Sequence, residues 1–138
     1  MKVDFEWYDE YSIGVDEIDV QHKRFLNLIE RTYELAEQTI ETREMFNLLD
    51  ELMRYAQFHF SSEELLMQAY FYPKHLEQKN EHVRIMKELV KGVEQIGSNQ
   101  GKLKNLLFVL INWFFDHDSH FDKEFGDYVN KHRISFTR

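Results

Sequence analysis

Apolar side chains recur along this chain every three or four residues, in four separate stretches. This spacing places side chains on one face of an α-helix, and no stretch shows the strict alternation typical of a strand. Four long amphipathic helices with short connections favour an all-α fold, an up-down-up-down four-helix bundle in a single domain. The predicted ranges are an irregular N-terminal arm over residues 1–17 and helices over about 18–38, 42–70, 73–96 and 102–130.

Glycine and proline are scarce and mark the ends of these stretches. The chain has five glycines and one proline. The segment "SIGVD" (12–16) ends the arm, and Tyr72-Pro73 ends the second stretch, because the residue before a proline is disfavoured in a helix. Pro73 is itself compatible with the first turn of the third helix.

Composition and charge exclude several classes of protein. The chain has 138 residues, 43% of them hydrophobic, which suits one packed domain. A net charge of −8 disfavours nucleic acid and anionic lipid as partners, and the lack of cysteine excludes disulfides and thiolate ligands. There is no glycine-rich phosphate loop and no G-x-S-x-G element. Without a signal-peptide core or a membrane-spanning apolar run, we expect a cytoplasmic protein that binds no membrane.

Side chains that can bind a metal interrupt every apolar stripe. His59 and Glu63 are four residues apart, as are Gln78 and His82, so each pair lies on one helical face. Taken helix by helix, the candidates are His22, then His59 with Glu63, then Gln78 with His82, and finally His117.

Two interpretations fit any one of these residues. A lone histidine on an apolar stripe is more often a hydrogen-bonded core residue than a ligand. A buried carboxylate such as Glu63 needs a cation or a proton donor, because an unpaired buried charge is costly. Inward polar groups from four helices in one layer favour a metal site in the bundle core. Nitrogen and oxygen donors suit iron, manganese, zinc or copper, and carboxylates able to bridge suggest two metals.

Longer blocks resemble the bacterial hemerythrin family. The segment "WYDEYSIGVDEIDVQHKRFL" (7–26) is similar to the family's W-x-x-x-Y-S-hydrophobic-G-V opening followed by I-D-x-Q-H-K. "HFSSEELLM" (59–67) resembles its H-F-x-x-E-E-x-x-M element, and "YP" (72–73) leads into the third helix. "WFFDHDSHFD" (113–122) resembles its W-x-x-x-H-x-x-x-x-D element. The blocks occur in the family's order.

The resemblance implies a non-haem di-iron centre, two iron ions joined by an oxo or hydroxo bridge, that binds dioxygen. Asp122 enters this set from the resemblance alone, because five residues on an ideal helix place it about 140° away from His117. The implied ligands are His22 and His59 on one iron, His82 and His117 on the other, and Glu63 and Asp122 as bridges.

Gln78 stands where the family's Y-P-x-x-x-x-H-x-x-x-H pattern has its first histidine. His75 cannot replace it, because His75 and His82 are separated by seven residues, about 10.5 Å along a helix. A neutral amide is a weaker donor than imidazole. Gln78 can therefore ligate weakly through its oxygen, hold a water at the vacant position, or leave the second metal loosely held or absent.

Asp118 is a second departure, since the family usually has an apolar residue there, close to the dioxygen pocket. If Asp118 faces the pocket, it offers a proton relay; the alternative is that it points to water. His120 and His132 match no motif, and we expect both to face solvent.

Three functions are consistent with these features. The family implies binding of dioxygen or a related small ligand, for storage or sensing. Gln78 and Asp118 raise the alternative of a di-iron redox enzyme or sensor that turns over peroxide, dioxygen or nitric oxide. A third possibility is a helical adaptor with a vestigial metal site. The sequence identifies no protein partner.

Overall fold

Helices account for every regular element of the computed structural model, which describes residues 5–38, 42–96 and 99–132. No strand occurs in these ranges. The elements in chain order are η1 (Asp9–Tyr11), α1 (Asp16–Ala36), α2 (Thr42–Ala69), α3 (His75–Ile96), α4 (Gln100–His117), η2 (Asp118–Asp122) and α5 (Lys123–Lys131). η1 is a short 3-10 turn and η2 is a π-helix.

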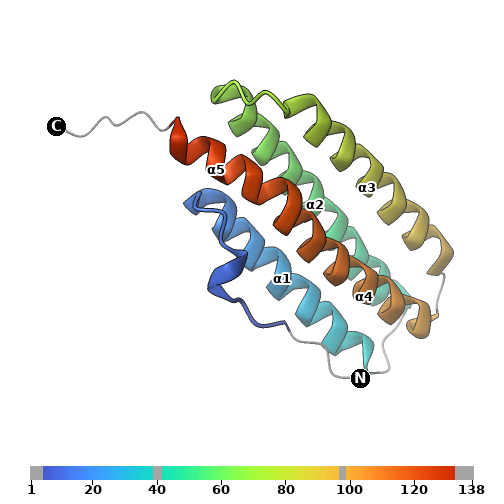
Figure 1. Cartoon of the computed structure of the whole chain (residues 1–138). Coiled ribbons are helices and arrows are strands. Elements are labelled where there is room, and N and C mark those ends of the chain that lie inside the picture. The colour runs from blue at the N-terminus through green and yellow to red at the C-terminus, as the bar shows by residue number, and fades with distance from the viewer. Residues whose placement is uncertain (1–4, 39–41, 97–98, 133–138) are drawn as a thin grey trace.

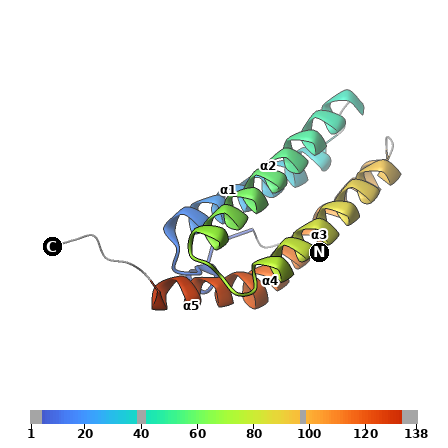
Figure 2. The same ribbon diagram turned by 90° about the horizontal axis from the view of Figure 1, so that it is seen from above.

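The four long helices enclose one core. α1 contacts α2 and α4, and α3 contacts the same two helices. Figure 1 shows them side by side, with α5 continuing the line of α4, and Figure 2 shows the same arrangement from above. The predicted four-helix bundle is confirmed. Within the described ranges, no helix is both long and apolar enough to cross a membrane.

The N-terminal arm is fastened to the start of α1 by one carboxylate. Asp19 accepts a hydrogen bond from the Ser12 hydroxyl (2.5 Å) and another from the backbone N–H of Ile13 (2.9 Å). Gly14 follows with φ of 79°, a left-handed conformation that glycine adopts without a steric penalty. The chain turns there and α1 begins at Asp16, two residues before the predicted start.

The connection between α2 and α3 is a tight turn held by α5. Phe71 has φ of 54°, the left-handed geometry that often ends a helix. The hydroxyl of Tyr128 donates hydrogen bonds to the carbonyls of Tyr70 (2.7 Å) and Phe71 (3.1 Å). The turn extends through Pro73, so α3 begins at His75 rather than at residue 73 as predicted.

Two apolar clusters lie on opposite sides of a layer of buried polar residues. Along α2, Phe60 belongs to the larger cluster and Met67 to the smaller, and the buried Glu63 lies between them. The larger cluster fills the bundle among α1 to α4. The smaller one joins the arm and α5 to the ends of α1 and α2, through Ile13, Val15, Ile18, Met67, Tyr72, Phe125 and Val129.

Gly126 lies where the arm crosses α5. A Cβ atom there would come within 1.9 Å of the carbonyl oxygen of Ile13, so Gly126→Ala must displace the arm. We expect the free energy of unfolding to fall by about 2–3 kcal/mol in urea titrations. Gly92→Ala is the matched control, because its Cβ would meet only the flexible end of Leu106. An equal loss in both variants would contradict this account.

Candidate metal centre

The structure brings six predicted side chains together in the layer between the two apolar clusters. Each is at most 4% exposed. α1, α2, α3, α4 and η2 all contribute, so the whole bundle must close before the layer exists. The six residues are His22, His59, Glu63, His82, His117 and Asp122.

Their donor atoms form two groups that share one carboxylate. The atoms within each group lie within 4.8 Å of one another, close enough to hold a metal ion. Glu63 belongs to both groups and reaches them from the C-terminal part of α2. The first group is His22, His59, Glu63 and Asp122, and the second is Glu63, His82 and His117.

Glu63 presents a different oxygen to each side of the layer. Its Oε1 faces His22 Nε2 at 3.4 Å and is also in contact with His59 Nε2. Its Oε2 faces His82 Nε2 at 3.6 Å. One carboxylate can therefore serve two metal positions at once, as in carboxylate-bridged pairs held in helical bundles.

Asp122, from η2, likewise presents one oxygen to each group of histidines. Its Oδ2 lies 3.2 Å from His22 Nε2 and its Oδ1 lies 3.1 Å from His117 Nε2. The two carboxylates thus connect the histidines of α1 and α2 with those of α3 and α4.

The π-helix η2 explains how Asp122 reaches the site. The sequence predicted one continuous helix over 102–130, in which Asp122 would point away from His117. Instead, residues 118–122 form a π-helix between α4 and α5. A π-helix has i→i+5 periodicity, so residues five apart share a face, and such segments are frequent at functional sites. The wider turn returns Asp122 to the side of His117.

The buried polar atoms of this layer are poorly satisfied by the protein itself. Among the described residues, neither oxygen of Glu63 makes a hydrogen bond, and neither do Asp122 Oδ1, His82 Nε2 or either ring nitrogen of His117. Buried polar groups without partners are costly and rare. Carboxylate oxygens and imidazole nitrogens that gather within 4.8 Å of one another can share a cation, so the donor set passes this test for a metal.

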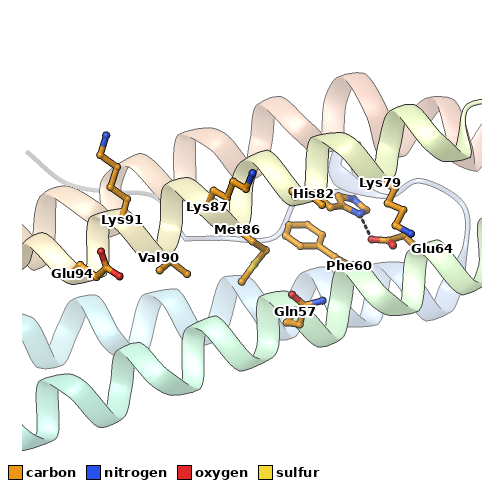
Figure 3. A pocket seen from close by; sticks show the side chains of 11 residues that line it. Gln57, Phe60, Glu64, Lys79, His82, Met86, Lys87, Val90, Lys91 and Glu94 are labelled. Atoms are coloured by element: carbon orange, nitrogen blue, oxygen red, sulfur yellow. Dashed lines mark hydrogen bonds and ion pairs between the residues drawn. The ribbon is translucent and has the colours of Figure 1, made fainter.

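Two further residues orient the histidines. Gln21 Oε1 lies 2.9 Å from His59 Nδ1, and Glu64 Oε2 lies 2.9 Å from His82 Nδ1. Figure 3 shows the second contact. Such bonds fix the ring so that Nε2 points at the metal. Gln21 and Glu64 did not enter the predicted site, although each directly neighbours a predicted ligand, which is the signal that could have found them.

Aromatic rings cover the histidines and exclude water. The ring of Phe60 stacks on His82 with centroids 4.1 Å apart, and Trp113 stacks on His117 at 5.6 Å. Phe114 meets His22 edge-on at 5.2 Å. A dry surrounding strengthens electrostatic interactions inside the site.

The charges of the site shift one another's pKa values. Burial alone would raise the pKa of Glu63, but the surrounding histidines, His59 foremost, hold it well below its usual range. Burial opposes the charged form of His82, yet Glu63 and Glu64 raise its pKa above the usual value. Asp122 and Glu63 do the same for His117 against a similar burial cost. The pKa of Asp122 is also lowered, against burial and the charge of Glu63, by His117 and His22. The buried carboxylates and imidazoles thus favour one another's charged forms.

Gln78 lies on the same buried face of α3 as His82. It is 1% exposed, and neither its amide oxygen nor its amide nitrogen has a hydrogen-bond partner among the described residues. An amide buried in this way needs a ligand of some kind. Gln78 is thus a polar side chain that no other described residue satisfies, and it lies one helical turn from a predicted ligand.

The remaining candidates lie outside the cluster. His75 is half-buried and faces Gln68, with Nε2 atoms 3.4 Å apart. His120 and His132 are exposed, as expected. The orientation of the Asp118 side chain lies outside what the structure describes.

Comparisons with known proteins agree with this geometry. Residues 13–129 match a family model described as the hemerythrin HHE cation binding domain. A bacteriohemerythrin of Clostridium acetobutylicum is 30% identical, over 89% of this chain and 99% of its own length. Another, of Stenotrophomonas maltophilia, is 27% identical, over 96% and 86%. A hemerythrin variant of known crystal structure shares the fold, with a TM-score of 0.80, 23% identity, and coverage of 89% of this chain and 95% of that one. The chain belongs to the hemerythrin family.

Proposed function

We propose that this protein holds two iron ions and binds dioxygen or a related small ligand. The observation that carries the proposal is the way Glu63 and Asp122 each turn one oxygen toward each side of the buried layer. His22 and His59 would hold one ion, and His82 and His117 the other. A ferrous pair supplies the electrons that dioxygen binding requires; the protein supplies position, charge and a dry enclosure.

Relatives named bacteriohemerythrin favour ligand binding over the redox-enzyme alternative. A cytoplasmic location remains a prediction.

We propose that Gln78 shapes the position that a histidine would otherwise fill. Its buried amide has no hydrogen-bond partner in the described part of the chain, so its oxygen can face a metal ion or a water held beside one. The second metal position then has two imidazoles and a weaker neutral donor. That position would be more open to added ligands than one with three imidazoles. Asp118, if its side chain faces the pocket, would add a proton donor nearby.

The ligand set can be tested through iron content. Glu63→Gln preserves volume but removes the charge shared by both metal positions, so we expect it to retain fewer than about half an iron ion per chain after anaerobic reconstitution. Elemental analysis provides the measurement. His75→Ala is the matched control and should retain both ions, because His75 lies outside the cluster. Iron loss in the control would show that the start of α3 takes part in the site.

The role of Gln78 can be tested by adding the missing imidazole. We expect Gln78→His to tighten iron binding by about tenfold and to slow oxidation of the reduced protein in air, because imidazole is the better donor. Competition with a chelator and stopped-flow absorption would measure the two effects. Asn80→His is the control, since Asn80 is exposed on the same helix. Unchanged affinity in Gln78→His would place Gln78 outside the metal's reach.

The raised histidine pKa values predict opposite pH effects on the metal-free and iron-loaded protein. Stability contributed by protonated His82 and His117 is fully present below the ordinary value of 6.5 and is lost as pH rises through the raised values. The metal-free protein should therefore lose unfolding free energy above about pH 6.5. Iron affinity should rise over the same range, because ligands bind iron as neutral imidazoles.

Urea unfolding and chelator competition across this range would measure both slopes. Glu64→Gln removes one of the carboxylates that raise the pKa of His82, so this variant should lose less stability with rising pH. Slopes of the same sign for stability and iron affinity would refute the assignment.

A further inference from the structure

An apolar groove of about 590 Å³ runs between α2 and α3, and His82 of the metal layer lines one end of it. Figure 3 shows its floor, where Phe60 and Met86 lie between the two helices beside Val90. Val83 and Val90 are 46% and 41% exposed, so the floor contacts water over a large area. Covering such a surface with an apolar ligand is favourable at about 25 cal/mol per Å². The volume is in the usual range of small-molecule sites.

The groove follows α3 over several turns. Its lining runs from Lys79 to Glu94, fifteen residues or about 22 Å of helix. An elongated apolar chain matches this shape better than a compact ring system does. The flexible side chain of Met86, midway along the floor, can adapt to such a chain.

Lysines line the α3 side of this groove, although the chain as a whole carries a net charge of −8. Lys87 and Lys91 are one helical turn apart. Their ammonium groups point in different directions in Figure 3, so both flexible side chains would have to turn over the groove to share one anion. Neither lysine is in an ion pair with the described part of the chain. Both are exposed, so an anion can reach them without displacing a protein group.

The acidic residues of the groove fix where an anion would lie. Glu64 is hydrogen-bonded to His82 at one end, and Glu94 lies beyond Lys91 at the other. Lys79 also lines the Glu64 end, but its ammonium group points toward Glu64 (Figure 3), so an anionic head is better placed between Lys87 and Lys91. From there the floor leads along Met86 and Val83 toward Phe60.

We propose that this groove binds a free straight-chain monocarboxylate, a fatty acid of medium length. The carboxylate lies between Lys87 and Lys91, and the alkyl chain covers the apolar floor as far as Phe60. Binding itself does not depend on iron. Because Phe60 stacks on His82 and both residues line the groove, the occupant also lies next to the metal layer; that coupling, unlike binding, rests on the proposed function.

The test is a titration of the full chain, labelled with ¹³C at the methionine methyl groups, with decanoate below its micelle concentration. The Met86 signal should shift, while the signals of Met45 and Met67, both at most 1% exposed and outside the groove, should stay in place. Acetate should have no effect, and decanol, which has the chain but no charge, should bind about tenfold more weakly. The result should be the same with and without iron, so failure of the iron proposal leaves this test intact.

Charge-removing variants complete the test. Lys87→Gln combined with Lys91→Gln should weaken decanoate binding by about tenfold and leave decanol binding unchanged. Lys131→Gln, an exposed lysine on α5, is the matched control and should bind decanoate as the parent does. An unmoved Met86 signal, or decanol binding as tightly as decanoate, would overturn the proposal. So would a Met86 shift that follows protein concentration without decanoate, because a second copy of the chain would then cover the groove.

Discussion

Two carboxylates buried at the centre of a helical bundle are the constraint on which this structure depends. Glu63 is 0% exposed and Asp122 is 1% exposed, and every ion-pair partner of either carboxylate in the described part of the chain is a histidine. Burying such groups without positive charge costs several kcal/mol each. The histidines of four helices, together with a cation, offset that cost. The bundle therefore has to close in the one register that brings these groups into a single layer.

Much of this layer could be predicted from the spacing of the apolar stripes. Glu63 and His82 lie on the apolar faces of their helices, which point into the bundle. Helical periodicity therefore predicts that both are buried and that they lie near each other in the core. Helical periodicity could not identify Asp122, because an ideal helix points residue 122 away from His117. The resemblance to a family supplied Asp122, and the π-helix η2 gives the physical reason why it lies beside His117.

Other features depend on contacts that a one-dimensional pattern does not contain. Gln21 and Glu64 lie beside predicted ligands in the chain, but their bonds to His59 and His82 cross between helices. Polar neighbours of this kind are common on helix surfaces, so their position alone singles out neither residue. The close approach of Gly126 to the arm likewise joins segments more than a hundred residues apart.

The position of the polar layer between two apolar clusters has a consequence for cooperativity. Each cluster is a separate hydrophobic core, and the polar layer around Glu63 lies between the two. A metal bound there would link helices that contribute to both clusters, so the two clusters would unfold as one cooperative unit. Without it, the smaller cluster around Phe125 becomes free to open before the larger one. Amide exchange at Phe125 and Leu107 would show this directly, as equal protection in the loaded protein and separate rates in the metal-free protein.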